Sequence, residues 1–239
     1  MNPKESTVKN MPTDQADGLR QLMSHGAGQM LAVVGSGPAV GATSVAVNLA
    51  AALAQQGKDV LLFDERRGRP LQTGQRKGRL LVIDTALDLQ GALSPLAAQA
   101  DHVLVVLQPN AASIKACYSC IKKLHYAHAL QRVRVLVNRA SDKAQAQHIL
   151  ANLAHTSGRY LSLTLQSAGA VRADARLSDA RRLNLSVVEA FQTSPATIDF
   201  HQIASDLLQW TWRPLDDGEA SAQATARPTS EAKPALQMH

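Results

Sequence analysis

Apolar residues along the chain fall into short uninterrupted runs, separated by longer segments in which they recur every three or four positions. The short runs predict six β-strands, of which the last is the weakest, over residues 30–34, 58–64, 79–84, 102–107, 132–138 and 160–165. The longer spacing predicts helices over residues 14–23, 43–56, 112–130, 142–154 and 196–212. Continuous apolar strands that alternate with amphipathic helices are typical of a parallel sheet covered on both faces. We therefore predict an α/β fold with a single doubly wound, mainly parallel sheet and helices on both faces.

The pattern also predicts one domain with polar segments on either side. Residues 1–13 are polar, and residues 213–239 are rich in Ala, Ser, Thr, Pro and Glu, so we expect both segments to be disordered. The folded domain is expected to span residues 28–212. Residues 14–25 contain the first predicted helix, which is marginal as a free peptide. A short helix tethered ahead of a domain is often a docking element.

Glycines and polar residues gather where the predicted strands end. A glycine-containing loop, residues 35–42, follows the first strand, and Asp64, Asp84 and Asn138 each end a later one. In parallel sheets ligands bind at the carboxyl ends of the strands. A glycine-rich loop offers backbone N–H groups, and the helix that follows points its N-terminus at the same anion. The sequence therefore predicts a nucleotide-phosphate site at the carboxyl ends of the strands.

The stretch GSGPAVGATSVAVNLA, residues 35–50, resembles the ParA/MinD ATPases, whose loop reads K-G-G-x-G-K-[ST]. On this resemblance Thr43 takes the position of the magnesium-binding hydroxyl. Gly37 takes the position of the family's signature lysine, and Ala42 that of its phosphate-loop lysine. Catalysis of phosphoryl transfer is mostly electrostatic positioning, so the loss of both cations is expected to cripple hydrolysis.

The strand-end residues support the same resemblance. Asp84 matches the family's Walker B aspartate, which contacts magnesium through water, and Asn138 matches its adenine-contacting asparagine. Asp64 begins a family D-x-D motif whose second aspartate positions the attacking water, but Arg66 stands there. Capping of strand ends is the alternative role for Asp84 and Asn138. The degenerate site is expected to comprise Gly35, Gly37, Gly41, Ala42, Thr43, Ser44, Asp64, Asp84 and Asn138, with Thr43 and Asp84 as ligands of any Mg²⁺. ATP with Mg²⁺ is thus a possible cofactor, bound weakly or not at all.

The helix predicted over residues 14–23 indicates which branch of the ParA/MinD family the chain resembles. DQADGLR, residues 14–20, resembles the D-Q-A-x-x-L-R motif of the FlhG family of flagellar-number regulators, also called FleN or YlxH. In that family the helix docks on the signal-recognition-type GTPase FlhF and stimulates its GTP hydrolysis. The resemblance therefore implies that partner for Asp14, Gln15, Ala16, Leu19 and Arg20, with Gln15 acting at the GTPase site. A flagellar transcription regulator or a switch component is a further implied partner.

The stretch 65–78 holds five basic residues where the family has a long helical insertion. Its simplest interpretation is a flexible, solvated connector, and the more specific one is a binding patch for anions or an acidic partner. Two alternative functions of the protein depend on this stretch. In an active MinD-type ATPase, Arg66, Arg67 or Arg69 would replace the lost lysines. In a ParA-like protein this stretch would contact nucleic acid, but aromatic residues do not interleave it, so nucleic acid is not expected.

Composition adds the expected cellular setting. The net charge of +6 is moderate, so it fits either ordinary solubility or an acidic partner. Cys117 and Cys120 are the only cysteines and lie three apart on a predicted helix, which indicates semi-buried residues of a reduced protein. No apolar run approaches the roughly 18 residues of a membrane span. Residues 196–212 end in QWTW but lack a basic face, so we expect packing on the sheet. A cytoplasmic protein is expected, with peripheral attachment to the inner membrane face as the alternative.

Overall fold

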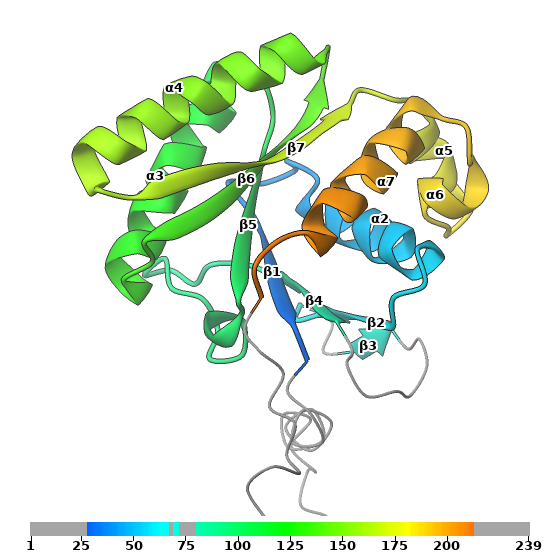
Figure 1. The fold of residues 1–239 in the computed structure, drawn as a ribbon, viewed down its shortest axis with the longest axis horizontal. Helices are drawn as coiled ribbons and strands as arrows, with labels where there is room; N and C mark the ends of the chain where they lie inside the picture. Colours follow the sequence, from blue (N-terminus) through cyan, green and yellow to red (C-terminus); the bar gives the residue numbers. More distant parts are fainter. Residues whose placement is uncertain (1–27, 67–68, 72–79, 213–239) are drawn as a thin grey trace, which may run out of the picture.

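The computed structural model describes residues 28–66, 69–71 and 80–212. Its centre is a sheet with strand order β3-β2-β4-β1-β5-β6-β7 (Figure 1). Every pairing is parallel except that of β3 with β2. The strands are β1 (Met30–Gly35), β2 (Val60–Asp64), β3 (Arg69–Leu71), β4 (Leu80–Thr85), β5 (His102–Leu107), β6 (Arg132–Ala140) and β7 (Thr164–Arg172). The predicted α/β class with a mainly parallel sheet is thus confirmed.

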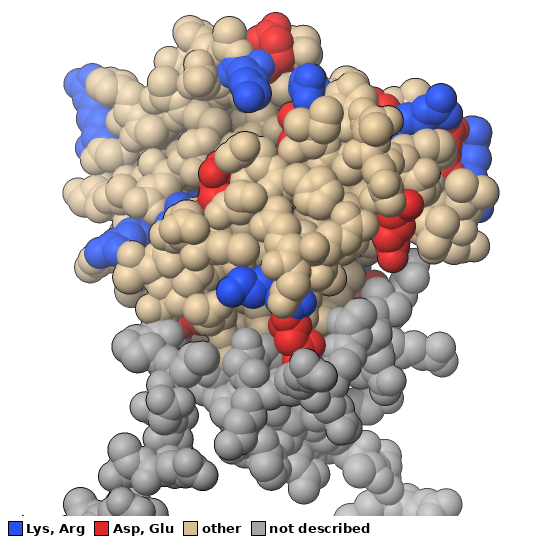
Figure 2. All heavy atoms as spheres, turned by 45° about the vertical axis from the view of Figure 1, so that its right-hand side comes forward, with Lys and Arg blue, Asp and Glu red and all other residues tan. Residues whose placement is uncertain are grey.

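Helices cover both faces of the sheet, as predicted (Figure 1). One face carries α2 (Ala42–Gln55), α5 (Arg176–Arg182), α6 (Val187–Ala190) and α7 (Pro195–Leu208). The other carries the short η1 (Ala97–Gln99), α3 (Ala111–His128) and α4 (Lys143–Leu161). On the face that Figure 2 shows, basic and acidic side chains form small groups separated by uncharged surface.

The two-residue period of the strands divides the core into two layers. In β1, Leu31 and Val33 pack on the α2 and α7 side, whereas Ala32 and Val34 pack on the α3 and α4 side. Alanines on the buried face of α2 allow this helix to approach the sheet closely. The core therefore forms with very few aromatic side chains, which make up 3% of the sequence.

Most of the longer helices begin at a side-chain cap. Asn110 accepts a hydrogen bond from Ser113 N (2.8 Å) at the start of α3, and Asp142 accepts one from Gln145 N (2.7 Å) at the start of α4. Ser194 caps α7, and Pro195 occupies its first turn. Helix α2 is the exception, because Gly41 precedes it with φ of 90° and no side chain caps it. The orphan N–H groups of its first turn are therefore left for another acceptor.

Three expectations about elements were wrong. The strand predicted over residues 160–165 is misplaced, because α4 continues to Leu161 and β7 begins only at Thr164. The extra helical turns bury Ser157 and Leu161, which continue the helical spacing of Leu153. The last helix ends at Leu208, so Trp210 and Trp212 lie beyond it.

The third correction concerns the basic stretch 65–78, in which Arg69–Leu71 forms β3 against β2 rather than a plain connector. Most of the remaining stretch lies outside the described residues. The segments 1–13, 14–25 and 213–239 also lie outside them, so those expectations stay predictions.

The expectations for the two cysteines and for the packing of the last helix hold. Cys117 and Cys120 are buried free thiols on α3, and burial raises the pKa of Cys120 to about 12. Helix α7 buries Phe200, Ile203 and Leu207 and packs on α2 and β7. No helix in the described part of the chain has the length and apolar character needed to cross a membrane.

Candidate nucleotide-binding site

The loop between β1 and α2 is held by hydrogen bonds to the carboxyl ends of two neighbouring strands. Ser36 N donates to Val106 O (2.9 Å). The Gln108 side chain donates to Ala39 O (2.9 Å), and Asn138 Nδ2 donates to Val40 O (2.9 Å). Val40 itself is buried in the core. The loop is therefore fixed by the fold itself, without any ligand.

Gly41 is required at the turn from loop to helix. Its φ of 90° is left-handed, and an added Cβ would lie 2.4 Å from Asn138 Nδ2. The glycine thus lets the loop approach the end of β6, where Asn138 is 4% exposed. Gly41 and Asn138, both expected in the nucleotide site, are therefore neighbours in the structure.

The first turn of α2 retains backbone donors but gains no side-chain cation from the loop. Its uncapped N-terminus favours an anion through its orphan N–H groups and the helix dipole. Ala42 is buried at the first helical position. Gly37 is more open, since an added Cβ would meet only Ala116 Cβ, at 3.9 Å. The two positions where the resemblance places lysines therefore supply no charge.

Asp84, at the end of β4, is a buried carboxylate that accepts no hydrogen bond from the described residues. It is 1% exposed, and neither oxygen has a hydrogen bond within the described residues. Burial raises its pKa. The nearby Thr43 hydroxyl and Arg66 charge oppose that rise, although neither donates a hydrogen bond to a carboxylate oxygen. A buried orphan carboxylate beside a hydroxyl suits a divalent cation.

The neighbouring carboxylates are engaged elsewhere. Asp64 pairs in register with Asp84 across β2 and β4, and its Oδ1 accepts Arg66 N (3.0 Å). Glu65 accepts hydrogen bonds from the hydroxyls of Thr85 and Ser94, the latter at 2.5 Å. Glu65 thus ties the turn after β2 to the segment after β4. Sequence reasoning missed this network, because it depends on strand register.

A cavity of about 390 Å³ opens beside the start of α2. Its lining includes Gly41, Ser44, Asn138, Arg139, Asp174 and Arg181. Arg139 has φ of 61° at a β-bulge in β6, a conformation that L-residues rarely adopt. Of these residues, Arg139, Asp174 and Arg181 were not predicted. No motif marks them, and they come together only through the fold.

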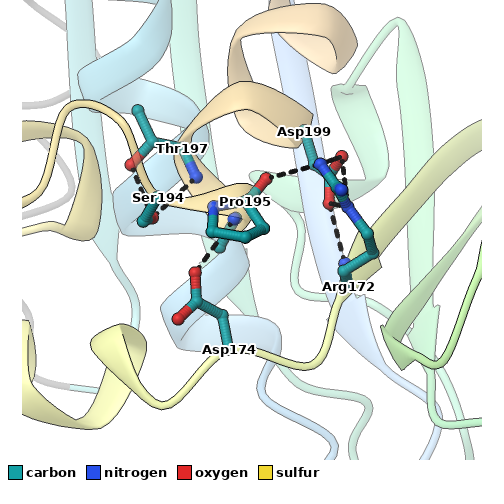
Figure 3. Close-up of polar contacts among 7 residues, drawn as sticks. Arg172, Asp174, Ser194, Pro195, Thr197 and Asp199 are labelled. Atoms are coloured by element: carbon teal, nitrogen blue, oxygen red, sulfur yellow. Dashed lines mark hydrogen bonds and ion pairs between the residues drawn. The ribbon is translucent and has the colours of Figure 1, made fainter.

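Hydrogen bonds and an ion pair connect the segment after β7, which lines this cavity, to α7 (Figure 3). Asp199, on α7, accepts Arg172 N (2.9 Å) and also Nε and Nη2 of the same residue (2.9 Å each). Asp174 accepts Ala196 N (3.1 Å) at the first turn of α7. The segment after β7 is therefore fastened to the start of α7, and Asp174 is held where it lines the cavity.

The structure thus brings together all the predicted nucleotide-site residues at the carboxyl ends of the strands. Asp14, Gln15, Ala16, Leu19 and Arg20 lie outside the described residues. The site fits part of a magnesium nucleotide. Thr43 and Asp84 would hold the metal, and the cavity beside Asn138 has room for a base. The described residues include no group of three or more His, Cys, Asp or Glu that could hold a metal, so the nucleotide itself would complete the coordination. The loop does not fit the charge of a triphosphate, because Gly37 and Ala42 leave its phosphates without a lysine.

Comparison with known proteins agrees with this geometry. Residues 31–186 match the family described as the CobQ/CobB/MinD/ParA nucleotide binding domain. A relative, the antiactivator FleN of Pseudomonas aeruginosa, is 26% identical over 253 aligned positions, covering 80% of this chain and 90% of FleN. MinD of Aquifex aeolicus has a similar structure, with a TM-score of 0.60 and 16% identity over 77% of this chain and 98% of its own. MinD of Pyrococcus horikoshii, solved with Mg-ADP, has a TM-score of 0.55 and 13% identity over 76% and 96%.

The two structural likenesses show the fold, and the family match spans more than half of the chain. Together with the FleN relative they place the loop, Asp84 and Asn138 in a known domain type. The chain belongs to the CobQ/CobB/MinD/ParA nucleotide-binding family.

Proposed function

We propose that this protein is a regulator of flagellar number, placement and biosynthesis that acts mainly by binding a partner. In this proposal residues 14–20 dock on the signal-recognition-type GTPase FlhF and stimulate its GTP hydrolysis. ATP binding and hydrolysis by the domain itself are weak or lost. The protein works in the cytoplasm, and a flagellar transcription regulator or a switch component is a second class of partner.

The observation that carries the proposal is the loss of cations from an otherwise well-formed phosphate loop. The loop, the uncapped start of α2 and Asp84 are all in place, but Gly37 and Ala42 contribute no charge. Because phosphoryl transfer depends on neutralising charge on the transferred group, the pocket is a poor catalyst. The DQADGLR segment supplies a different chemistry, since a glutamine given in trans can orient the attacking water of a GTPase.

The test is a GTP-hydrolysis assay of the cognate GTPase titrated with the full-length protein. We expect the wild-type protein to raise the rate at saturation. Gln15→Ala is expected to lower the maximal stimulated rate by about 10-fold or more, as for loss of a water-positioning group. An unchanged GTPase rate with the wild-type protein would reject the proposal.

A second candidate is an active MinD-type ATPase, with nucleotide-dependent dimerisation and membrane association. It is favoured by the orphan Asp84 and by the charge of Arg66, which acts on it. In that case Arg66 replaces a lysine. Micromolar binding of Mg-ATP, with turnover that is lost in Asp84→Ala, would support this candidate over the first.

A further inference from the structure

The chain that follows α7 folds back onto the amino end of the sheet, opposite the nucleotide loop (Figure 1). We call residues 209–212 the strap. It contains Trp210 and Trp212, the only two tryptophans of the protein, and both are half-buried. The Trp210 ring lies 3.6 Å from the Arg134 guanidinium carbon. His102 meets both tryptophan rings edge-on and contacts Thr211 O at 3.0 Å.

The same end of the sheet holds the start of the domain. Met30 N donates to Asp101 Oδ2 (2.8 Å), and the residue after Asp101, His102, contacts the Trp212 ring of the strap. Residues that precede β1 therefore join the domain beside the strap. Ten peptide steps separate Arg20 from Met30 and sixteen separate Asp14 from it, so residues 14–20 lie at most about 35–55 Å from this point. A protein that binds residues 14–20 is thereby kept within this distance of the strap.

The strap surface offers unpaired arginines next to aromatic rings. Arg134 stacks on Trp210, and its buried Nε has no hydrogen-bond partner within residues 28–66, 69–71 and 80–212. Arg132 is exposed on the same strand, and its charge acts on both His102 and Arg134. Tryptophan and arginine are the residues that most often dominate the energy of protein interfaces. Free guanidinium donors favour carboxylates as partners.

We propose that the GTPase that receives residues 14–20 makes a second contact, through an acidic and partly apolar surface, with the strap, Arg132 and Arg134. This inference rests on the proposed function, and it adds that the folded domain itself takes part in recognition. The strap lies outside residues 31–186, which the family model matches. Two linked contacts bind more tightly than either alone, because the second forms at high effective concentration.

The test uses full-length variants in the GTP-hydrolysis titration. Arg132→Glu reverses an exposed charge and Trp212→Ala removes a half-buried ring. Each is expected to raise the concentration for half-maximal stimulation roughly five- to tenfold, with the maximal rate unchanged. Gln15→Ala moves the maximal rate instead, so the two roles separate. One matched control, Lys143→Glu, lies on the exposed first turn of α4 at the other end of the sheet. A second, Leu89→Ala, removes an apolar side chain at a residue outside the strap that is 96% exposed.

The outcomes are distinct. If Arg132→Glu leaves the half-maximal concentration unchanged while Gln15→Ala lowers the maximal rate, the strap contact is wrong and the proposed function stands. If wild-type protein gives no stimulation, both fail. Thermal unfolding of Trp212→Ala reports loosening of the strap. If Trp212→Ala unfolds, the result is decided by Arg132→Glu, which changes an exposed side chain.

Discussion

Replacing Asp84 with asparagine is expected to stabilise the protein at neutral pH. Both oxygens of this side chain are buried, and the described residues donate no hydrogen bond to them. Burying an unpaired carboxylate costs several kcal/mol of lost hydration free energy. Burying a neutral polar group without a partner costs roughly 1–3 kcal/mol, which is about half as much or less. The amide keeps the shape and removes the charge. We expect a gain of about 1–3 kcal/mol in the free energy of unfolding at pH 7.

The gain should depend on pH with a definite sign. Burial raises the pKa of Asp84 above its ordinary 3.8, so the folded state binds the proton more tightly than the unfolded state. The stability that this proton contributes is fully present below the unfolded-state pKa and is lost as the pH rises through the folded-state pKa. Asparagine has no proton to lose. The difference between the variant and the wild type should therefore be small below about pH 4 and grow towards neutral pH.

Urea unfolding of both proteins between pH 4 and pH 8, without divalent cations, measures this difference. Asp64→Asn is the matched control, because Asp64 accepts Arg66 N and its replacement is not expected to stabilise. A variant that is less stable than wild type at pH 7, or a difference that does not change with pH, would refute the reasoning. Either result would mean that Thr43 or Arg66 already compensates the Asp84 charge.

Two further predictions address the cavity wall and the missing cations. Asp199→Asn is expected to lower the free energy of unfolding by about 1–3 kcal/mol, because Asp199 is 6% exposed and accepts three donors of a partly exposed Arg172. A loss below about 0.5 kcal/mol in urea unfolding would show that this ion pair is not structural. Gly37→Lys combined with Ala42→Lys is expected to tighten Mg-ATP binding about tenfold or more in calorimetric titration. Equal tightening in Gly37→Gln with Ala42→Gln would show that charge is not what the loop lacks.

Sequence reasoning succeeded where a single segment determines its own structure. The strands from β1 to β6 are apolar runs long enough to be recognised, apart from the three-residue β3. Their carboxyl ends brought Asp84 and Asn138 to the loop as predicted. Strand β7 was misplaced because it pairs only with β6 at the sheet edge and carries polar residues such as Gln166 and Ser167. The Glu65 network and the Arg172–Asp199 pair could not be predicted, since each joins residues whose proximity depends on strand register or helix packing.

The retention of the loop has a physical explanation that does not involve a nucleotide. Ser36, Ala39 and Val40 each use a backbone group to bind a residue at the end of β5 or β6. Val40 also packs in the core, and Gly41 admits the Asn138 side chain. These contacts persist whether or not a phosphate is bound, so a change at Gly41 would disturb the fold. Gly37 and Ala42 carry none of these polar contacts. Cations at those two positions can therefore be absent without loss of the loop conformation, as the proposed partner-binding role requires.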